Sequence, residues 1–528
     1  MIIVNNVKLS LDTDFDNLLS TAKKLSVFKA VKLTSAKLYR KSVDARHKDN
    51  VHFCCTLLVE VAGNESDAVK RIKEARIFSE EDYKFKVSDL TPENPPVVVG
   101  FGPAGIFAAY LLAKAGLRPI VLERGKDVDA RTTAVKSFWN GGALNTETNV
   151  QFGEGGAGAF SDGKLTTGIK DPRCRTVLKL FTEFGAQKNI LTDAKPHIGT
   201  DILVDVIKNL RNEIIRLGGD VRFSHKLESI SVTEGKLCSV EVSCSRKNYT
   251  LPCEHLILAT GHSARDTFYM LRDSGITMIR KPFAVGMRIE HSQKELNEFL
   301  YGEFANHPAL GPADYKLAVH LSSGRGVYTF CMCPGGVVVN ASSEEGRIAV
   351  NGMSCSARNG ENANSAILTE VLPEDLPGDD VLAGVEFQRS LEEKAYNLVG
   401  GRGVPVQTVG DYLYSNGQEC TISPSIKPYP VFTSVSEIFP NFINASIKEG
   451  IHLMDGKMSG FRGGSLLVAP ESRSSSPVRI LRDETFNSVS LVGLYPCGEG
   501  AGYAGGIMSA AVDGMKCAEA VINNINKL

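Results

Sequence analysis

Residues 96–125 read PVVVGFGPAGIFAAYLLAKAGLRPIVLERG and are the most informative stretch of the chain. The apolar run at 97–99 has the length and the β-branched character of a strand buried in a parallel sheet. A helix-forming segment follows at 104–115, and a second apolar run at 119–122 leads into Glu123. A strand, a glycine-rich turn, a helix and a second strand in this order predict the first βαβ unit of a Rossmann-like domain.

The glycines of this stretch, Gly100, Gly102 and Gly105, have the spacing G-x-G-x-x-G. The first permits a tight turn, the second lets a pyrophosphate approach the backbone, and the third lets the helix pack on the strand. The helix N-terminus adds unpaired N–H groups and a positive dipole end. Glu123 can accept hydrogen bonds from a ribose diol, which suits FAD or NAD. The same predicted cofactor site includes Pro103, Ala104 and Arg124.

The composition is that of an ordinary globular protein without a dominant charge. The 528 residues are 43% hydrophobic and 23% charged, with a formal net charge of −1, and their number suggests two or three domains. This balance disfavours nucleic acid as a partner, and the apolar runs are too short to span a membrane. The N-terminus has no secretory pattern, and twelve cysteines lack disulfide-framework or metal-ligand spacing. We therefore expect a cytoplasmic protein without a metal site.

The patterns divide the chain into four segments. Residues 1–90 have the order βαββα, which is typical of a ferredoxin-like α/β module. Residues 96–270 form the first part of the cofactor-binding domain, and residues 471–528 complete it. Between them, residues 271–470 alternate strand candidates with glycine-rich turns, as in a mixed, mainly antiparallel substrate or cap domain. The expected fold class is α/β, with a Rossmann-like domain, this second domain and the small N-terminal module.

A second glycine-rich stretch lies at 149–171, NVQFGEGGAGAFSDGKLTTGIKD. Its six glycines disfavour a helix or strand, whereas Val150, Phe152, Phe160 and Leu165 would anchor it to a core. An anchored loop of this kind favours contact with a flat cofactor ring or a phosphate. The residues predicted to take part are Gly155, Gly156, Ala157, Gly158, Ser161 and Lys164.

Two later segments are expected to return to the first sheet. The strand in HLILATGH, residues 255–262, ends at Thr260 and Gly261, which would lie near the adenosine side of the site. The strand at 491–496 enters CGEGAGYAGGI, which a helix rich in small residues follows. This second helix N-terminus would present N–H groups to another electron-rich group. The predicted contacts are Gly498, Glu499, Gly505, Gly506 and Ile507.

Together, VVVGFGPAGIFAA with Glu123, LILATGH and LYPCGEGAGYAGGI resemble the FAD-binding fold of the glutathione-reductase type. The resemblance implies adenosine diphosphate at residues 100–105 and Glu123, ribityl hydroxyls near Glu499, and the flavin at the late helix. The segments SVDARHK, NVQFGEGGAGAFSDGKL, FCMCPGGVVV and SRSSSPVRI further resemble the uncharacterised FAD-dependent protein or FAD-utilising dehydrogenase family. This narrower resemblance does not indicate which substrate the protein uses.

We expect an FAD-dependent oxidoreductase that moves hydride or electron pairs through non-covalent FAD, with a small-molecule substrate bound between the flavin and residues 271–470. No second G-x-G-x-x-G follows a strand, so NAD(P)H could donate electrons only without a dedicated domain. Cys331 and Cys333 are either a thiol relay or buried, non-reactive cysteines. The predicted catalytic residues are Cys331, Cys333, Arg473 and Tyr503, with Arg325, Asn359, Asn362 and Arg479 as further lining candidates.

Three other functions stay open at this point. One is an FAD-dependent RNA-modifying enzyme that docks RNA through residues 1–90, where the basic run 40–48 offers contacts. The second is a flavin reductase of isoprenoid-type substrates, and the third is a non-enzymatic flavin redox sensor. The oligomeric state does not follow from the sequence.

Overall fold

A five-stranded parallel sheet forms the centre of the cofactor-binding domain. The computed structural model describes residues 1–80, 82–245, 247–414 and 420–527. The strands of this sheet are β5 (Val97–Val99), β6 (Ile120–Glu123), β7 (Asp220–Phe223), β11 (Leu256–Leu258) and β23 (Leu494–Pro496). Their order is β23-β11-β5-β6-β7, and every neighbouring pair is parallel. The predicted Rossmann-like sheet is confirmed.

One face of this sheet carries helices and the other carries a β-ribbon. The covering elements are α3 (Pro103–Lys114), α5 (Arg173–Glu183), α6 (Thr200–Arg216), α12 (Ile507–Ile525), β8 (His225–Thr233), β9 (Lys236–Cys244) and β10 (Lys247–Pro252). Val98 and Ile257 pack into the cluster that the helices form. Val97 and Leu256 alternate to the opposite face, where they pack with Leu227 of the ribbon. The strands are apolar throughout because both faces are covered.

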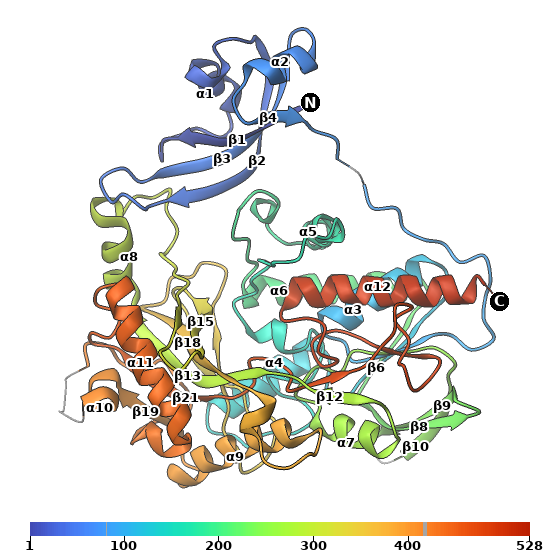
Figure 1. Ribbon diagram of the computed structural model, residues 1–528. Coiled ribbons are helices and arrows are strands. Elements are labelled where there is room, and N and C mark those ends of the chain that lie inside the picture. The colour runs from blue at the N-terminus through green and yellow to red at the C-terminus, as the bar shows by residue number, and fades with distance from the viewer. Residues whose placement is uncertain (81, 246, 415–419, 528) are drawn as a thin grey trace.

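The helices α3 and α12 lie against each other (Figure 1). They cross so closely that a Cβ atom on Gly514 of α12 would overlap the carbonyl oxygen of Ala104 in the first turn of α3. Ala104 and Gly514 are both buried. A glycine at this crossing therefore fixes where the start of α3 lies relative to α12.

A seven-stranded sheet with helices beside it makes up the cap domain (Figure 1). Its strands are β13 (Phe283–Ser292), β14 (Ala318–His320), β15 (Gly326–Cys333), β18 (Asn362–Val371), β19 (Val404–Thr408), β20 (Pro430–Phe432) and β21 (Leu466–Glu471). Their order is β14-β15-β18-β13-β21-β19-β20, and all pairs are antiparallel except β19 with β20. Its helices are α8 (Gln293–Tyr301), α9 (Ala383–Leu398), α10 (Val409–Tyr414) and α11 (Asn441–Lys457), and it includes the short pair β16 (Val337–Asn340) with β17 (Val350–Met353). A second short pair, β12 (Met278–Arg280) with β22 (Val478–Ile480), joins the two domains, and Val478 and Ile480 pack with the parallel sheet. The mainly antiparallel second domain is thus present.

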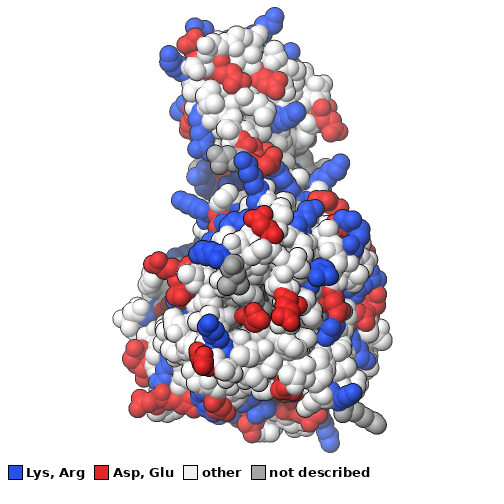
Figure 2. All heavy atoms as spheres, turned by 90° about the vertical axis from the view of Figure 1, so that its right-hand side faces the viewer, with Lys and Arg blue, Asp and Glu red and all other residues white. Residues whose placement is uncertain are grey.

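The N-terminal module forms a separate lobe above the larger body (Figure 2). Its elements are β1 (Ile2–Leu9), α1 (Leu18–Lys24), β2 (Leu33–Asp44), β3 (His52–Val61), α2 (Glu65–Arg71) and β4 (Ala75–Ile77). The order β2-β3-β1-β4 with antiparallel pairing is the ferredoxin-like arrangement, in which β4 completes the βαββα pattern. Acidic and basic side chains are interspersed on the face shown, in keeping with the near-zero net charge.

The chain that leaves the module lies on the cofactor-binding domain. The Tyr83 hydroxyl donates to Glu519 at 2.6 Å, the Lys86 Nζ donates to Asn523 at 2.7 Å, and the Ser88 N–H donates to the carbonyl of Ala115. Residues 82–90 thus cover α12 and the end of α3, although we expected them to belong to the N-terminal module.

None of the helices in the described part of the chain combines the length and apolarity that a membrane span requires.

The crossing of α3 and α12 can be tested with Gly514→Ala. We expect the free energy of unfolding to fall by about 1–3 kcal/mol, because the added methyl overpacks a buried contact. The control is Gly456→Ala in α11, where no described atom lies within 4 Å of the added Cβ. That change should leave stability equal or raise it by up to about 1 kcal/mol through helix propensity. Urea denaturation of both variants gives the comparison; equal midpoints would show that the helices do not need the glycine.

Candidate functional site

A cavity of about 1010 Å³ lies where the carboxyl ends of the parallel strands face the cap domain. Val99, Glu123 and Ala259 line it from the sheet, and Phe330 and Cys331 line it from β15. Ligands of open α/β sheets bind at this edge, and the volume is at the upper end of small-molecule pockets. The predicted residues that line it are Gly100, Gly102, Pro103, Ala104, Glu123, Arg124, Gly156, Ala157, Gly158, Ser161, Lys164, Thr260, Gly261, Glu499, Gly505, Gly506, Ile507, Cys331, Arg473 and Tyr503.

Two helix N-termini face this one cavity. Gly102 precedes α3 and Gly506 precedes α12, and both glycines line the cavity together with the first turns of their helices. Each helix start presents unpaired N–H groups and the positive end of its dipole. The structure therefore brings together the two glycine-rich helix starts that the sequence places about four hundred residues apart.

Glycine-to-glycine contacts shape the wall between these helix starts. A Cβ on Gly156 would stand 2.9 Å from the Cα of Gly102, and a Cβ on Gly500 would stand 2.6 Å from the carbonyl carbon of Gly261. Only main chain fits at these two places, so a ligand in the cavity can approach the backbone of Gly102, Gly156 and Gly261 without meeting a side chain there. This backbone cradle fits the pyrophosphate of a dinucleotide such as FAD.

Glu123 has a structural role that the sequence did not reveal. Its Oε1 accepts hydrogen bonds from the N–H groups of Gly125 and Gly153, both at 2.9 Å, and its Oε2 accepts one from Phe101 at 2.8 Å. These bonds tie the first glycine-rich turn to the 149–171 loop. A carboxylate has about four acceptor sites, so one on Oε2 remains for a ribose hydroxyl.

The 149–171 loop is held from behind by Arg131 of α4 (Val128–Trp139), which is completely buried. Its guanidinium donates to the carbonyls of Asn149, Val150, Gly153 and Glu154 at 2.6–3.2 Å. The expected apolar anchors are buried as well, and they are Val150, Phe152, Phe160 and Leu165. The sequence predicted these apolar anchors, but nothing local marks Arg131, because its partners are main-chain carbonyls.

Glu499 lies next to a histidine at the cavity wall. Its Oε1 is 3.6 Å from Nδ1 of His262, and Nε2 of His262 is 2.8 Å from the carbonyl of Arg473. Burial lowers the pKa of His262 to about 4, so the ring is neutral, and the carbonyl requires the proton on Nε2. Burial raises the pKa of Glu499 to about 7. At 3.6 Å the two side chains are too far apart for a direct hydrogen bond, and the carboxyl of Glu499, with this raised pKa, binds or releases a proton beside the cavity near neutral pH.

Gly498 does not line the cavity, contrary to our expectation. It makes the turn before Glu499 with a φ of 77°, and its N–H donates to Asp513 of α12 at 2.8 Å.

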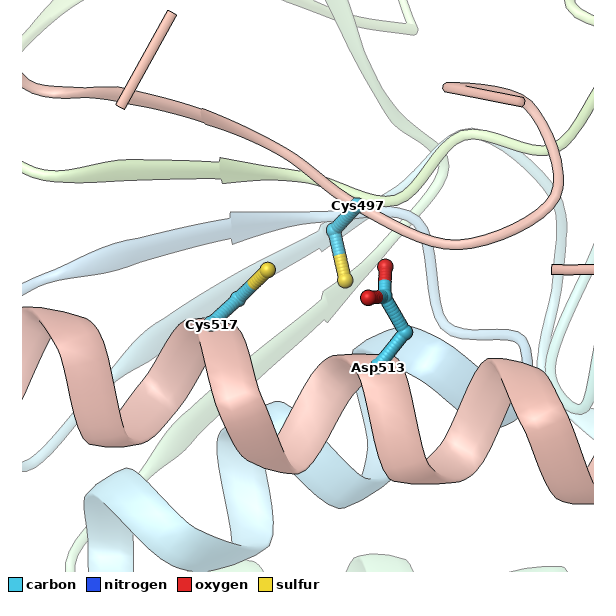
Figure 3. Close-up of side chains that lie close together, drawn as sticks. All are labelled: Cys497, Asp513 and Cys517. Atoms are coloured by element: carbon cyan, nitrogen blue, oxygen red, sulfur yellow. The ribbon is translucent and has the colours of Figure 1, made fainter. Parts of the chain in front are cut away.

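Cys497, Asp513 and Cys517 lie close together behind this turn (Figure 3). Arg482 donates two hydrogen bonds to Asp513, at 2.6 and 3.0 Å, and one to the sulfur of Cys517. The positive charge that this buried cluster needs is thus supplied by a guanidinium.

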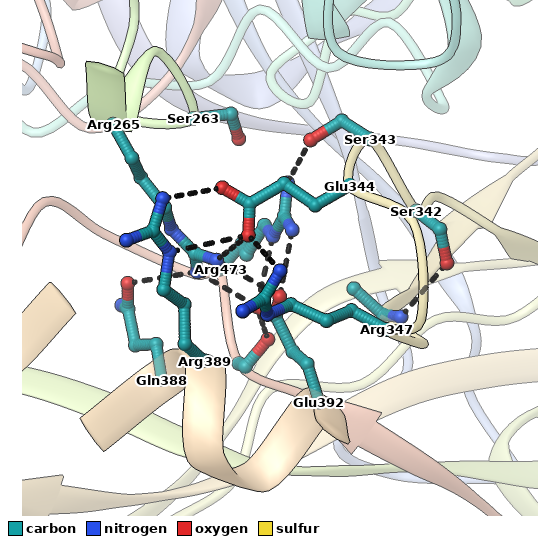
Figure 4. A network of polar contacts seen from close by, with 12 residues as sticks. Ser263, Arg265, Ser342, Ser343, Glu344, Arg347, Gln388, Arg389, Glu392 and Arg473 are labelled. Carbon is teal, nitrogen blue, oxygen red and sulfur yellow. Dashed lines mark hydrogen bonds and ion pairs between the residues drawn. The ribbon is translucent and has the colours of Figure 1, made fainter. Parts of the chain in front are cut away.

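The guanidinium of Arg473 is not placed to bind a substrate, because its hydrogen bonds are made within a buried ion network (Figure 4). Its Nη2 and Nε donate to Glu392 at 2.7 and 2.9 Å, and it also contacts Ser343. Arg265, in the first turn of α7 (Arg265–Asp273), donates to the same carboxylate at 2.7 and 2.9 Å. The network joins α9 of the cap to the cofactor-binding domain. Arg473 therefore positions the two domains, and its carbonyl orients His262.

Several other predicted residues also lie away from the cavity for identifiable reasons. A Cβ on Gly105 would overlap the carbonyl of Gly100, so Gly105 serves helix packing, and Gly155 packs against Ile207. Arg325 pairs with Asp375, and Arg479 donates to the carbonyl of Gly502. The remaining candidates outside the lining are Asn359, Asn362 and Cys333.

Comparisons with known proteins assign the family. Residues 282–474 match the family described as "FAD-dependent protein, C-terminal domain-like", residues 95–282 match "Pyridine nucleotide-disulphide oxidoreductase", and residues 1–60 match a domain of unknown function. An uncharacterized protein of Clostridium beijerinckii is 47% identical over 532 residues, which cover 99% of each chain. The chain therefore belongs to this family of FAD-dependent proteins and is a flavoprotein of the oxidoreductase class.

Solved structures with related architecture are distant. A geranylgeranyl bacteriochlorophyll reductase-like protein of Thermoplasma acidophilum is 13% identical, with 82% of this chain and 79% of that chain covered and a TM-score of 0.36. The flavin-dependent brominase Bmp2 is 10% identical, with 82% and 80% covered and a TM-score of 0.37. At these scores the likeness carries no argument about substrate.

The buried network predicts that Glu392→Gln destabilises the protein. Removal of the charge takes away the carboxylate with which Arg473 pairs and leaves Arg265 with Glu344 alone, and breaking a buried ion pair of this kind costs about 3–5 kcal/mol. Glu393→Gln is the matched control, because the next residue of α9 is exposed and should change stability by less than about 0.5 kcal/mol. Thermal and urea unfolding measure both variants. A Glu392→Gln protein as stable as the control would contradict the role of the network.

Proposed function

We propose that the protein is an FAD-dependent oxidoreductase that holds FAD in the cavity, with its pyrophosphate at the N-terminus of α3 and its flavin at the N-terminus of α12. The convergence of α3 and α12 on one backbone-lined cavity carries this proposal. The pyrophosphate would lie at Gly102 and the first turn of α3, and a ribose hydroxyl would bind Oε2 of Glu123. The flavin end would lie at Gly505, Gly506 and the start of α12. When bound, FAD supplies two-electron redox chemistry.

The residues around the flavin end have distinct tasks. The first turn of α12 stabilises negative charge through its N–H groups and dipole. Glu499, with its raised pKa, holds a proton on its carboxyl below about pH 7 and accepts hydrogen bonds as a carboxylate above that value. Tyr503 lies under the guanidinium of Arg482, 3.7 Å from the ring centroid, which fixes its ring at the wall. These groups orient the cofactor and control protonation next to it.

The cap side of the cavity would receive a small-molecule substrate. Tyr315, Phe330 and Met332 provide apolar surface there, whereas Asn351 and Arg358 provide polar groups. This mixed lining does not favour a purely isoprenoid substrate.

The basic side chains of residues 40–48 contact other parts of this chain, since Lys41 pairs with Asp193 and Lys48 lies over Phe299. These contacts support a structural role for the run rather than RNA docking.

The FAD site is tested by Gly102→Ala. The added Cβ would stand 3.6 Å from the Cα of Gly156, an ordinary contact, so the fold should persist while the space for the pyrophosphate shrinks. We expect FAD affinity to fall at least about tenfold, equivalent to about 1.4 kcal/mol, with an unchanged circular dichroism spectrum. Gly311→Ala is the control, because no described atom lies within 4 Å of its added Cβ. Unchanged FAD affinity in Gly102→Ala would refute the assignment.

NAD(P)H is the proposed electron donor, and anaerobic stopped-flow spectroscopy tests it. Without a dedicated nucleotide domain the donor should bind weakly, so the rate of flavin reduction should rise linearly with NADH or NADPH over the accessible range. The loss of flavin absorbance is the measurement. Saturation at micromolar donor would indicate a built nucleotide site, and no reduction by either nucleotide would exclude both as donors.

A further inference from the structure

We propose that Arg358, with the charge of Lys164 beside it, forms a carboxylate-binding subsite on the cap side of the cavity, and that the substrates are small carboxylic acids with an apolar body. The proposal rests on the proposed function, since it names the substrate class of that same cavity. The observations that carry it are the free edge of a fixed guanidinium, an ammonium group without a counter-ion, and an apolar wall.

Arg358 lines the cavity with a guanidinium that keeps one edge free. Its Nε donates to the fully buried Asp162 at 3.0 Å, and its Nη2 donates to the other oxygen of that carboxylate. Nη1 has no hydrogen-bond partner among the described residues and is not buried. The edge formed by Nη1 and the second hydrogen of Nη2 can therefore bind both oxygens of a carboxylate in one plane. In Arg473, by contrast, all three nitrogens donate within the buried ion network.

The backbone around Arg358 is fixed to the cofactor-binding domain. The N–H and the hydroxyl of Ser356 both donate to Asp201, in the first turn of α6, at 2.7 Å. The hydroxyl of Ser354 donates to Asp162, the carboxylate that also holds the guanidinium. Arg358 itself adopts a left-handed φ of 46°, which residues with a side chain rarely adopt. A guanidinium held in this way loses little freedom when a ligand binds to it.

Lys164 supplies the positive charge that an anion needs. It lines the cavity, is half-buried and has no ion-pair partner among the described residues. Burial and the charge of Arg358 lower the pKa of His197 to about 4, and Lys164 adds to this effect against the opposing charge of Asp162. His197 is therefore neutral. Because Asp162 already balances Arg358, the excess here is one positive charge, which matches a monoanionic carboxylate better than a phosphate dianion.

The acidic side chains that line this side of the cavity do not oppose an anion. Asp314 accepts from Lys195 at 2.5 Å, and Glu471 pairs with the fully buried Arg288 at 2.8 Å. Glu499, at the proposed flavin end, has a pKa that burial raises to about 7, so its carboxyl is mostly neutral below that value. The charge of Lys164 is therefore left for a ligand.

The 149–171 loop connects this subsite to the place proposed for the flavin. A Cβ on Gly158 would stand 3.1 Å from Cγ1 of Ile507, the first residue of α12. The hydroxyl of Ser161 donates to the carbonyl of Gly158 at 2.8 Å, and Asp162 and Lys164 follow directly. A carboxylate at the subsite would therefore lie on the flavin side of the cap.

An apolar wall on β15 completes the subsite. Phe330 and Met332 line the cavity, and the Phe330 side chain is 39% exposed although it is apolar. The carbonyl of Arg358 lies against Gly335, just beyond the end of β15, where a Cβ on the glycine would overlap it. An acid whose carboxylate binds Arg358 can thus place its apolar body on this wall, and covering it there is favourable.

Calorimetric titration of the FAD-loaded protein with matched acids and amides tests the subsite. The probes are benzoate, 3-phenylpropionate and octanoate, the primary amide of each, and phenyl phosphate, all at about pH 6.5, where the carboxylates of the probes are ionised. We expect at least one acid to bind with a Kd at least about tenfold lower than that of its amide. Three results would overturn the proposal: no acid binds, the amides bind as tightly as the acids, or phenyl phosphate binds more tightly than every acid.

Variants assign the binding to the two side chains. Arg358→Lys keeps a charge for Asp162 but lacks the planar edge, and Lys164→Met keeps the stem without the charge. Each should raise the Kd of the acid about tenfold and leave the Kd of its amide and the FAD content unchanged. Lys170→Met is the control, because this lysine of the same loop is exposed and does not line the cavity.

A second variant keeps the test decisive where Arg358→Lys fails to fold. Asp162→Asn with Arg358→Gln removes the ion pair as a unit, so no charge of the pair stays buried alone. An acid that binds all variants as tightly as the original protein would contradict the assignment. Equal weakening of acid and amide would indicate a structural role only, and loss of FAD from Lys164→Met would place this lysine at the cofactor instead.

The flavin spectrum separates this proposal from the proposed function. An acid bound beside the flavin should shift the flavin absorbance bands, and the shift should saturate with the Kd that calorimetry gives. A protein that holds FAD but binds no acid would refute the subsite while the proposed function stands. A protein that binds no FAD would refute the proposed function itself, whereas calorimetry would still report on the binding of acids.

Discussion

The close approach of main chain at a few glycines is the constraint on which the site depends. The N-terminus of α3 can face the same cavity as the N-terminus of α12 only because Gly514 lets the two helices cross at Ala104. The 149–171 loop reaches this point through Gly156 against Gly102, and the late loop reaches it through Gly500 against Gly261. A side chain at any of these contacts would separate two segments and widen the backbone cradle. The cavity is therefore a consequence of backbone packing first and of side-chain chemistry second.

Buried arginines hold the loops that this packing brings together. Arg131 binds the carbonyls of the 149–171 loop, Arg482 binds Asp513 behind the Gly498 turn, and Arg473 binds Glu392 across the domain boundary. Each guanidinium has several donors in a fixed plane, so one side chain can satisfy many carbonyls of an irregular loop. Irregular backbone inside a protein requires such partners, because unpaired carbonyls and charges are costly there. The arginines thus allow glycine-rich loops to be ordered next to the cofactor site.

The sequence predicted the elements whose signals are local. The strand at Val97–Val99, the G-x-G-x-x-G turn and the terminal Glu123 occur in one short stretch, and the structure has them as expected. The same holds for the late turn before α12 and for the antiparallel character of the cap. Arg473 was misread because its partner, Glu392, lies about eighty residues away, and the charge pattern of a loop does not reveal a buried counter-ion. Gly498 was assigned to the ligand, although it makes a turn whose N–H donates to Asp513, whereas Gly105 has the packing role that its place in the motif predicted.

The sequence by itself determined the class of the protein, because periodicity, glycine spacing and terminal acids are properties of neighbouring residues. Only the tertiary structure decided which side chains face the cavity. The pairing of Arg473 with Glu392, the neutral His262 beside Glu499 and the three main-chain donors on Glu123 all depend on contacts between distant segments. Such contacts are fixed when the whole chain packs, since burial and partner choice, and with them pKa values, are set by neighbours that no local pattern encodes.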